Sequence, residues 1–152
     1  EVTAIADRMG LTPFTVLQPK YNLVWRQEYE GALQDLCVRR GIAVLPYYGL
    51  ASGFLSGKFR KPEDWQGSTR AHALAEFANN GGWETLAVLD SVAAEAGATV
   101  AQVALAWLNA QPGIAAPLAS ATTKAQLADL AKAVTLELSP EQLARLSAPV
   151  TG

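Results

Sequence analysis

The stretch IAVLPYYGLASGFLSGKFR, residues 42–60, decides the fold. Its beginning, IAVLPY, is a short apolar run that follows Gly41, a pattern typical of a strand buried in a parallel sheet. The segment from Tyr47 to Arg60 then holds three glycines, two serines and an aromatic pair, with Lys58 near its end. In α/β folds, ligands bind beyond the carboxyl ends of the strands. We therefore expect a buried strand that leads directly into a ligand-binding loop.

The rest of the chain alternates similar apolar runs with helical patterns. FTVLQ (14–18) and IAAPLAS (114–120) are predicted as two further strands, covered on both faces. Capping boxes are predicted at Thr99 with Gln102, Thr123 with Gln126, and Ser139 with Gln142. Helices are predicted over residues 1–10, 28–41, 70–80, 83–97, 99–113, 125–134 and 140–146. This order predicts the α/β class, with about three parallel strands and flanking helices.

Composition excludes several classes of function. The chain has 152 residues, half of them hydrophobic, which is enough for one domain with a core. The net charge of −2 gives no basic face for nucleic acid, and no apolar run approaches the ~20 residues of a membrane span. The lone Cys37 cannot form an internal disulfide, which predicts a reducing, cytoplasmic location. One histidine and one cysteine leave no nitrogen–sulfur metal site.

The first ten residues already have a helical pattern. Val2, Ile5, Ala6 and Met9 share one face, and no signal peptide or methionine precedes them. Either the terminus is trimmed or processed, or the chain is a fragment that begins inside a helix of a larger domain.

The segments that follow the predicted strands contain the candidate site residues. Glycines at 53 and 57 allow positive φ and close approach to a ligand, and the turn after Thr123 attracts anions. Tyr47 could present a flat face to a flat ring. Hydroxyls and positive charges are added by Ser52, Ser56, Thr122, Thr123, Lys58, Arg60 and Lys124. Together they favour a dinucleotide, although no Rossmann or Walker fingerprint is present and an ordinary glycine-rich turn remains the alternative.

Several ordered motifs resemble the C-terminal half of an aldo-keto reductase. Residues 17–60, LQPKYNLVWRQEYEGALQDLCVRRGIAVLPYYGLASGFLSGKFR, resemble the family's Q-x-x-Y-N-L, E-x-x-L-x-x-C and L-x-x-G-x-L-x-G-K stretches. Residues 97–127, GATVAQVALAWLNAQPGIAAPLASATTKAQL, resemble its G-x-T-x-A-Q-V-A-L-x-W segment and the strand, loop and helix that follow. The resemblance implies the C-terminal part of a (β/α)₈ barrel, with residues 1–152 as a partial domain. A complete barrel takes about 250 residues.

The same resemblance implies an NADP(H)-dependent reduction of aldehydes or ketones to alcohols. Gln18 would lie near the nicotinamide carboxamide, and Tyr47 would stack on its ring. The other implied cofactor-binding residues are Leu50, Gly53, Leu55 and Lys58 along the phosphates, and Ser120, Thr122, Thr123 and Gln126 at the 2′-phosphate and adenine end. Three departures leave the choice between NADP and NAD open: Tyr48 replaces a serine, Thr122 an arginine and Leu130 an asparagine.

The family's catalytic tetrad belongs to the N-terminal half, so we assign no catalytic residue and expect the isolated chain to be inactive. The alternative is a non-catalytic nucleotide-binding or assembly module. Its exposed sheet edges would pair with a complementing N-terminal half or a second copy. Of the remaining residues, we expect Cys37 and Trp107 in the core, Trp25 beside a small carbonyl substrate, and His72 exposed without a role.

Overall fold

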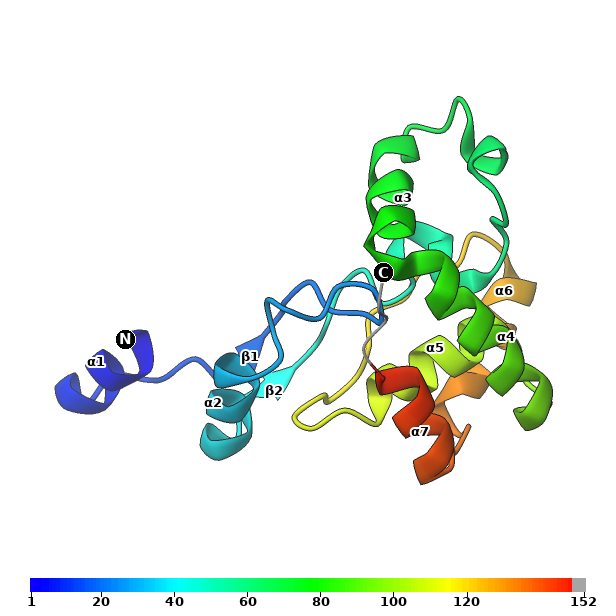
Figure 1. The fold of residues 1–152 in the computed structure, drawn as a ribbon. Coiled ribbons are helices and arrows are strands. Elements are labelled where there is room, and N and C mark those ends of the chain that lie inside the picture. Colours follow the sequence, from blue (N-terminus) through cyan, green and yellow to red (C-terminus); the bar gives the residue numbers. More distant parts are fainter. Residues whose placement is uncertain (149–152) are drawn as a thin grey trace.

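The computed structural model describes residues 1–148 as a helix-rich α/β fold (Figure 1). Two very short strands lie near the N-terminus, and most of the helices form a body on the other side of the molecule. The strands are β1 (Val16–Leu17) and β2 (Ala43–Val44). The helices are α1 (Val2–Met9), α2 (Ala32–Arg40), α3 (Ala71–Phe77), α4 (Trp83–Ala96), α5 (Val100–Asn109), α6 (Lys124–Ala131) and α7 (Pro140–Ser147). Short 3-10 segments cover Ala51–Ser56, Pro62–Trp65 and Lys132–Val134, and a π turn covers Ala78–Gly82.

The sheet is parallel, as predicted, but it is shorter than predicted. β1 pairs with β2 in parallel, with Val16 opposite Ala43. Of residues 114–120, only Ile114 forms a β-bridge, to Val44. This run continues beside β2 through the Leu118 N–H, which donates to the Pro46 carbonyl at 2.9 Å. Prolines at 46 and 117 have no N–H to donate, so they interrupt a regular ladder.

The predictions that FTVLQ and IAAPLAS are covered on both faces are wrong, since no residue of IAAPLAS is buried and Leu118 is 39% exposed. Phe14 is 69% exposed and Val16 is 51% exposed. The apolar face predicted for α1 is also largely uncovered. Val2 and Met9 are exposed, and only Ala6 of this helix is buried. In Figure 1, α1 stands apart from the helical body, and the later helices pack on one another rather than over β1.

The core is centred on α5. Residues 101–108 of this helix are all buried, which explains why VALAWL is apolar on every side. Trp107 is fully buried, and its ring centroid lies 5.7 Å from that of Tyr21. Cys37 is buried as predicted, and burial raises the pKa of its thiol. Helix α4 packs against α5 and carries Leu89 into the same cluster.

Local signals at the helix ends mostly agree with the sequence. Thr99 and Ser139 form the predicted capping boxes with Gln102 and Gln142. Gly41 ends α2 in the left-handed conformation. The predicted start of α2 at residue 28 is wrong, because residues 28–31 form turns and the helix begins at Ala32.

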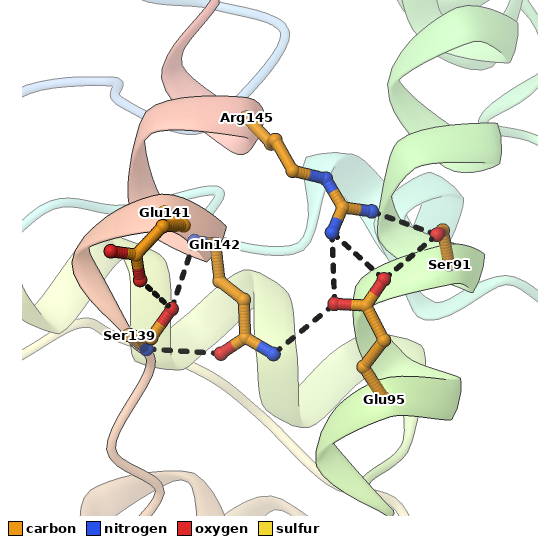
Figure 2. Close-up of polar contacts among 6 residues, drawn as sticks. All are labelled: Ser91, Glu95, Ser139, Glu141, Gln142 and Arg145. Carbon is orange, nitrogen blue, oxygen red and sulfur yellow. Dashed lines mark hydrogen bonds and ion pairs between the residues drawn. The ribbon is translucent and has the colours of Figure 1, made fainter.

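Two polar networks hold α7 in place. Arg145 donates to both carboxylate oxygens of Glu95 on α4, each at 2.8 Å, and to the Ser91 hydroxyl (Figure 2). At the last residue of α7, Arg26 donates to the Ser147 carbonyl at 2.8 Å and pairs with Glu30. These contacts fix α7 to α4 and to the loop that follows β1.

No single helix among residues 1–148 is long and apolar enough to cross a membrane. The pair Ala71–Ala96 and Val100–Asn109 reaches that length and composition only across a bend of 95°.

Candidate functional site

A cleft of about 660 Å³ opens beyond the carboxyl end of β2. Its walls come from residues 48–58, residues 69–73 at the start of α3, and residues 118–130, which include most of α6, and Ala101 of α5 also lines it. Two of these walls are segments that follow predicted strands, which is where the sequence placed its candidate site.

The structure brings most of the predicted cofactor-binding residues together. Six of them line the cleft: Leu50, Gly53, Lys58, Ser120, Thr122 and Gln126. The other four lie outside its walls. Gln18 is exposed at the end of β1, Tyr47 is 39% exposed beside the cleft residue Tyr48, Leu55 is fully buried in the core, and Thr123 caps α6.

The backbone of the loop after β2 is unusual. Tyr48, Ala51 and Ser52 all have positive φ, at 60°, 48° and 58°. Residues other than glycine rarely adopt this region. The Tyr48 carbonyl accepts hydrogen bonds from the Asn22 side-chain amide at 2.9 Å and from the Ala51 N–H at 2.7 Å. Asn22 is itself buried and accepts from the Val24 N–H. The loop after β1 therefore fixes the shape of the loop after β2.

Glycine is favoured at position 53 by its backbone conformation, and a neighbouring side chain lies directly over it. Its φ is +92°, and a Cβ at this position would lie 2.9 Å from Lys58 Cε and 3.0 Å from Lys58 Nζ. The lysine therefore crosses directly over the glycine. Close approach at Gly53 was predicted for a ligand, and in the structure it also positions a cation in the cleft wall.

The cleft carries cations without acidic partners. Within residues 1–148, neither Lys58 nor Arg70 lies within ion-pair distance of a carboxylate. Among the described residues, the one cleft carboxylate is Asp129, which accepts from the Gln102 amide at 2.7 Å and from the Thr99 hydroxyl at 3.2 Å and keeps its negative charge. Two cations against one carboxylate leave the cleft with a net positive charge, which favours an anionic ligand.

Arg60, which the sequence grouped with Lys58, lies elsewhere. Its guanidinium forms two hydrogen bonds to Asp90 on α4, at 2.6 and 3.0 Å, and the bonding to Asp90 raises the pKa of Arg60. Arg60 is therefore neutralised by a side chain 30 residues away along the chain, a contact that sequence spacing does not reveal.

The capping box predicted at α6 forms only in half. The Thr123 hydroxyl accepts from the Gln126 N–H at 3.2 Å, as expected of an N-cap. The Gln126 side-chain oxygen accepts from the N–H and the hydroxyl of Thr122, each at 2.9 Å, rather than from the Thr123 backbone. Both Thr122 and Gln126 face the cleft, so their polar atoms lie together at its α6 wall.

Sequence reasoning missed Tyr48 and Arg70 as cleft residues. Tyr48 was noted only as a departure from a motif, and Arg70 reaches the cleft because residues 62–82 fold back over the loop. His72 is exposed, as predicted, but it belongs to the same wall as Arg70.

Trp25 lies outside the cleft walls, and the Lys20 ammonium lies 3.3 Å from its ring centroid. No metal-binding cluster of acidic, histidine or cysteine side chains occurs in the described part of the chain.

Comparison with known proteins identifies a family and several relatives of this chain. A model described as "Aldo/keto reductase family" matches residues 1–149. A probable voltage-gated potassium channel subunit beta of Arabidopsis thaliana is 31% identical over 144 residues, covering 88% of this chain and 42% of that protein. Protein tas of Escherichia coli is 31% identical over 147 residues, covering 95% of this chain and 42% of that protein. An L-glyceraldehyde 3-phosphate reductase of Escherichia coli O157:H7 is 28% identical over 141 residues, covering 88% of this chain and 41% of that protein. The chain thus spans less than half the length of these relatives.

Proposed function

The chain belongs to the aldo/keto reductase family, and on that premise we propose that its cleft binds the phosphate-bearing part of NADP(H). The observation that carries the proposal is the pair of unneutralised cations, Lys58 and Arg70, in the walls of one cleft. The family implies a (β/α)₈ barrel. The parallel pairing of β1 with β2 is consistent with this chain being one part of it.

The residues of the cleft fit this part of the dinucleotide. A volume of about 660 Å³ is within the usual range for a ligand site. Phosphate oxygens need donors and positive charge, and the cleft offers the hydroxyls of Ser52 and Ser120 besides its cations. Leu50, Gly53 and Leu55 would support the pyrophosphate, with Leu55 acting from the core beneath the loop. Ser120, Thr122, Thr123 and Gln126 would receive the adenine and 2′-phosphate end.

The two free cations favour NADP(H) over NAD(H). A 2′-phosphate adds negative charge that Lys58 and Arg70 can neutralise, and charge-assisted hydrogen bonds are about twice as strong as neutral ones. The loss of the usual arginine at Thr122 would be compensated by Arg70 from the facing wall.

In the whole protein we propose the reduction of a small aldehyde or ketone to an alcohol. When bound, NADPH supplies the hydride. This chain orients the nicotinamide through Gln18 and Tyr47, which lie beside the cleft rather than in it. A relative named L-glyceraldehyde 3-phosphate reductase is consistent with a carbonyl substrate. We assign no proton donor to this chain, so by itself it would be inactive. A cytoplasmic location is part of the proposal.

A second candidate function is assembly. The apolar side chains of Val2, Met9, Phe14 and Val16 are exposed on the N-terminal side of the molecule, along β1 and α1. Relatives named as potassium channel beta subunits are, by that name, components of assemblies. This face would pair with a complementing barrel segment or a second copy. Sedimentation that remains monomeric with and without an N-terminal half from a relative would contradict this candidate.

A titration with NADPH and NADH, followed by tryptophan fluorescence, tests the cofactor proposal. The chain has four tryptophans, and two of them, Trp65 and Trp83, stack near the loop that forms one wall. Saturable binding of NADPH that is tighter than binding of NADH would support the proposal. A chain that is folded by circular dichroism but binds neither nucleotide at millimolar concentration would contradict it.

A further inference from the structure

We propose that Tyr48 is a further cofactor-binding residue whose ring packs against the nicotinamide riboside half of the bound dinucleotide. This proposal rests on the cofactor assignment above. It goes further because it assigns contact with the nicotinamide end to Tyr48, which lines the cleft, and not to Tyr47 alone.

The position of Tyr48 supports this assignment. Tyr48 lines the cleft and is 48% exposed, whereas the predicted platform, Tyr47, does not line the cleft. The two rings lie side by side, with centroids 5.2 Å apart at an angle of 52°. An open aromatic face in a ligand cleft offers a stacking surface for a planar ring.

The place of Tyr48 along the cleft identifies which half of the ligand it meets. It directly follows Tyr47, which forms a parallel bridge with Lys20 just beyond Gln18 at the end of β1. The residues assigned to the adenine end, Thr122 and Gln126, belong to the start of α6. In Figure 1, α6 lies on the far side of the body from β1 and β2. The nicotinamide half therefore points toward Tyr48.

The backbone of Tyr48 shows that this ring position is held against strain. Its φ of 60° is costly for a bulky residue. The conformation is maintained by the two hydrogen bonds that its carbonyl accepts from Asn22 and Ala51. The ring is half exposed, so burial in the core does not compensate the strain. Glycine would suit this backbone better. Removing the side chain at position 48 should therefore stabilise the fold and weaken ligand binding, so the two effects can be measured separately.

The test compares Tyr48→Gly, Tyr48→Asn and Tyr48→Phe in the full chain by calorimetric titration. Glycine and asparagine tolerate positive φ but lack the ring, whereas phenylalanine keeps the ring and the strain. We expect the first two variants to bind NADPH about threefold to tenfold more weakly, with a thermal midpoint equal to or above that of the parent. Tyr48→Phe should bind within about twofold of the parent.

Two controls locate the effect. Adenosine 2′,5′-bisphosphate, which lacks the nicotinamide half, should bind the parent and Tyr48→Gly equally well. Gly67→Ala changes a position of positive φ outside the cleft and should leave NADPH affinity unchanged. NADPH affinity of Tyr48→Gly equal to that of the parent would overturn the proposal, as would an equal loss of affinity for both ligands. A folded parent that binds neither ligand would instead overturn the cofactor assignment, and this proposal with it.

Discussion

The cleft and the face between α4 and α7 are both polar, but they differ in how their charges are matched. On the α4–α7 face, Arg145 donates to both oxygens of Glu95 and to Ser91, and Gln142 reaches the same carboxylate at 3.4 Å (Figure 2). In the cleft, no carboxylate lies within ion-pair distance of Lys58 among the described residues. The arginine on the α4–α7 face is therefore paired with a carboxylate of the protein itself, whereas Lys58 in the cleft has no such partner among the described residues.

The two regions also differ in backbone conformation: the α4–α7 face has regular helical geometry, and the cleft loop has strained geometry. The residues of the α4–α7 face lie on regular helices, and Ser139 caps α7 with a complete capping box. The cleft loop holds Tyr48, Ala51 and Ser52 at positive φ. Unmatched charge together with costly backbone geometry indicates ligand binding, whereas matched charge on regular helices indicates packing.

The largest effect is expected from removing the unmatched cations. Lys58→Ala or Arg70→Ala should weaken NADPH binding by about 10- to 100-fold, because each would remove a charge-assisted contact of roughly 1.5–3 kcal/mol. Arg145→Ala is the matched control, since it removes a cation that already has its partner. Calorimetric titration measures all three. Equal affinities in Lys58→Ala, Arg70→Ala and Arg145→Ala would contradict the claim that the unpaired cations of the cleft bind the cofactor.

A smaller effect is expected at Gly53. Gly53→Ala should lower the free energy of unfolding by about 1 kcal/mol because of its positive φ, and should weaken NADPH binding severalfold by displacing Lys58. Gly67→Ala is the matched control, because Gly67 also has positive φ but has nothing within 4 Å of the added methyl group. Denaturant unfolding should show similar losses for both variants. If Gly67→Ala weakened binding as much as Gly53→Ala, displacement of Lys58 would not be the cause.

The smallest effect is expected from Glu95→Gln on the matched face. The hydrogen bond from Arg145 lowers the pKa of Glu95. A lowered pKa in the folded state means that the stabilisation is present above the ordinary glutamate pKa of about 4.3, and is lost as the pH falls through the lower folded value. The thermal midpoint of the parent should therefore exceed that of Glu95→Gln slightly at pH 7, and the gap should close as the pH falls below about 4. A gap that is the same at pH 7 and pH 3 would contradict this account, and NADPH affinity should not change.

The features that sequence predicted well are local. The capping boxes at Thr99 and Ser139, and the left-handed Gly41 at the end of α2, depend on residues within one turn of each other. The strands were predicted less well because strand pairing depends on distant segments. The apolar character of Phe14 and Val16 indicated burial, yet no described element covers them.

The candidate site was predicted in part for the same reason. Positions such as Gly53 and Thr122 follow strands, so topology alone brings them to one edge. Arg70 joins them only because residues 62–82 fold back, and Arg60 leaves them only because Asp90 lies nearby. Contacts of this kind depend on the packing of whole segments, and no local pattern encodes them.

Hydrogen–deuterium exchange of the chain with and without NADPH compares the two regions most directly. We predict slower exchange in residues 49–58 and 119–126, which contribute to the cleft walls, and unchanged exchange in residues 91–95 and 139–145 on the α4–α7 face. Protection on the α4–α7 face with none in the cleft would contradict the central claim that the unmatched charges mark the cofactor site.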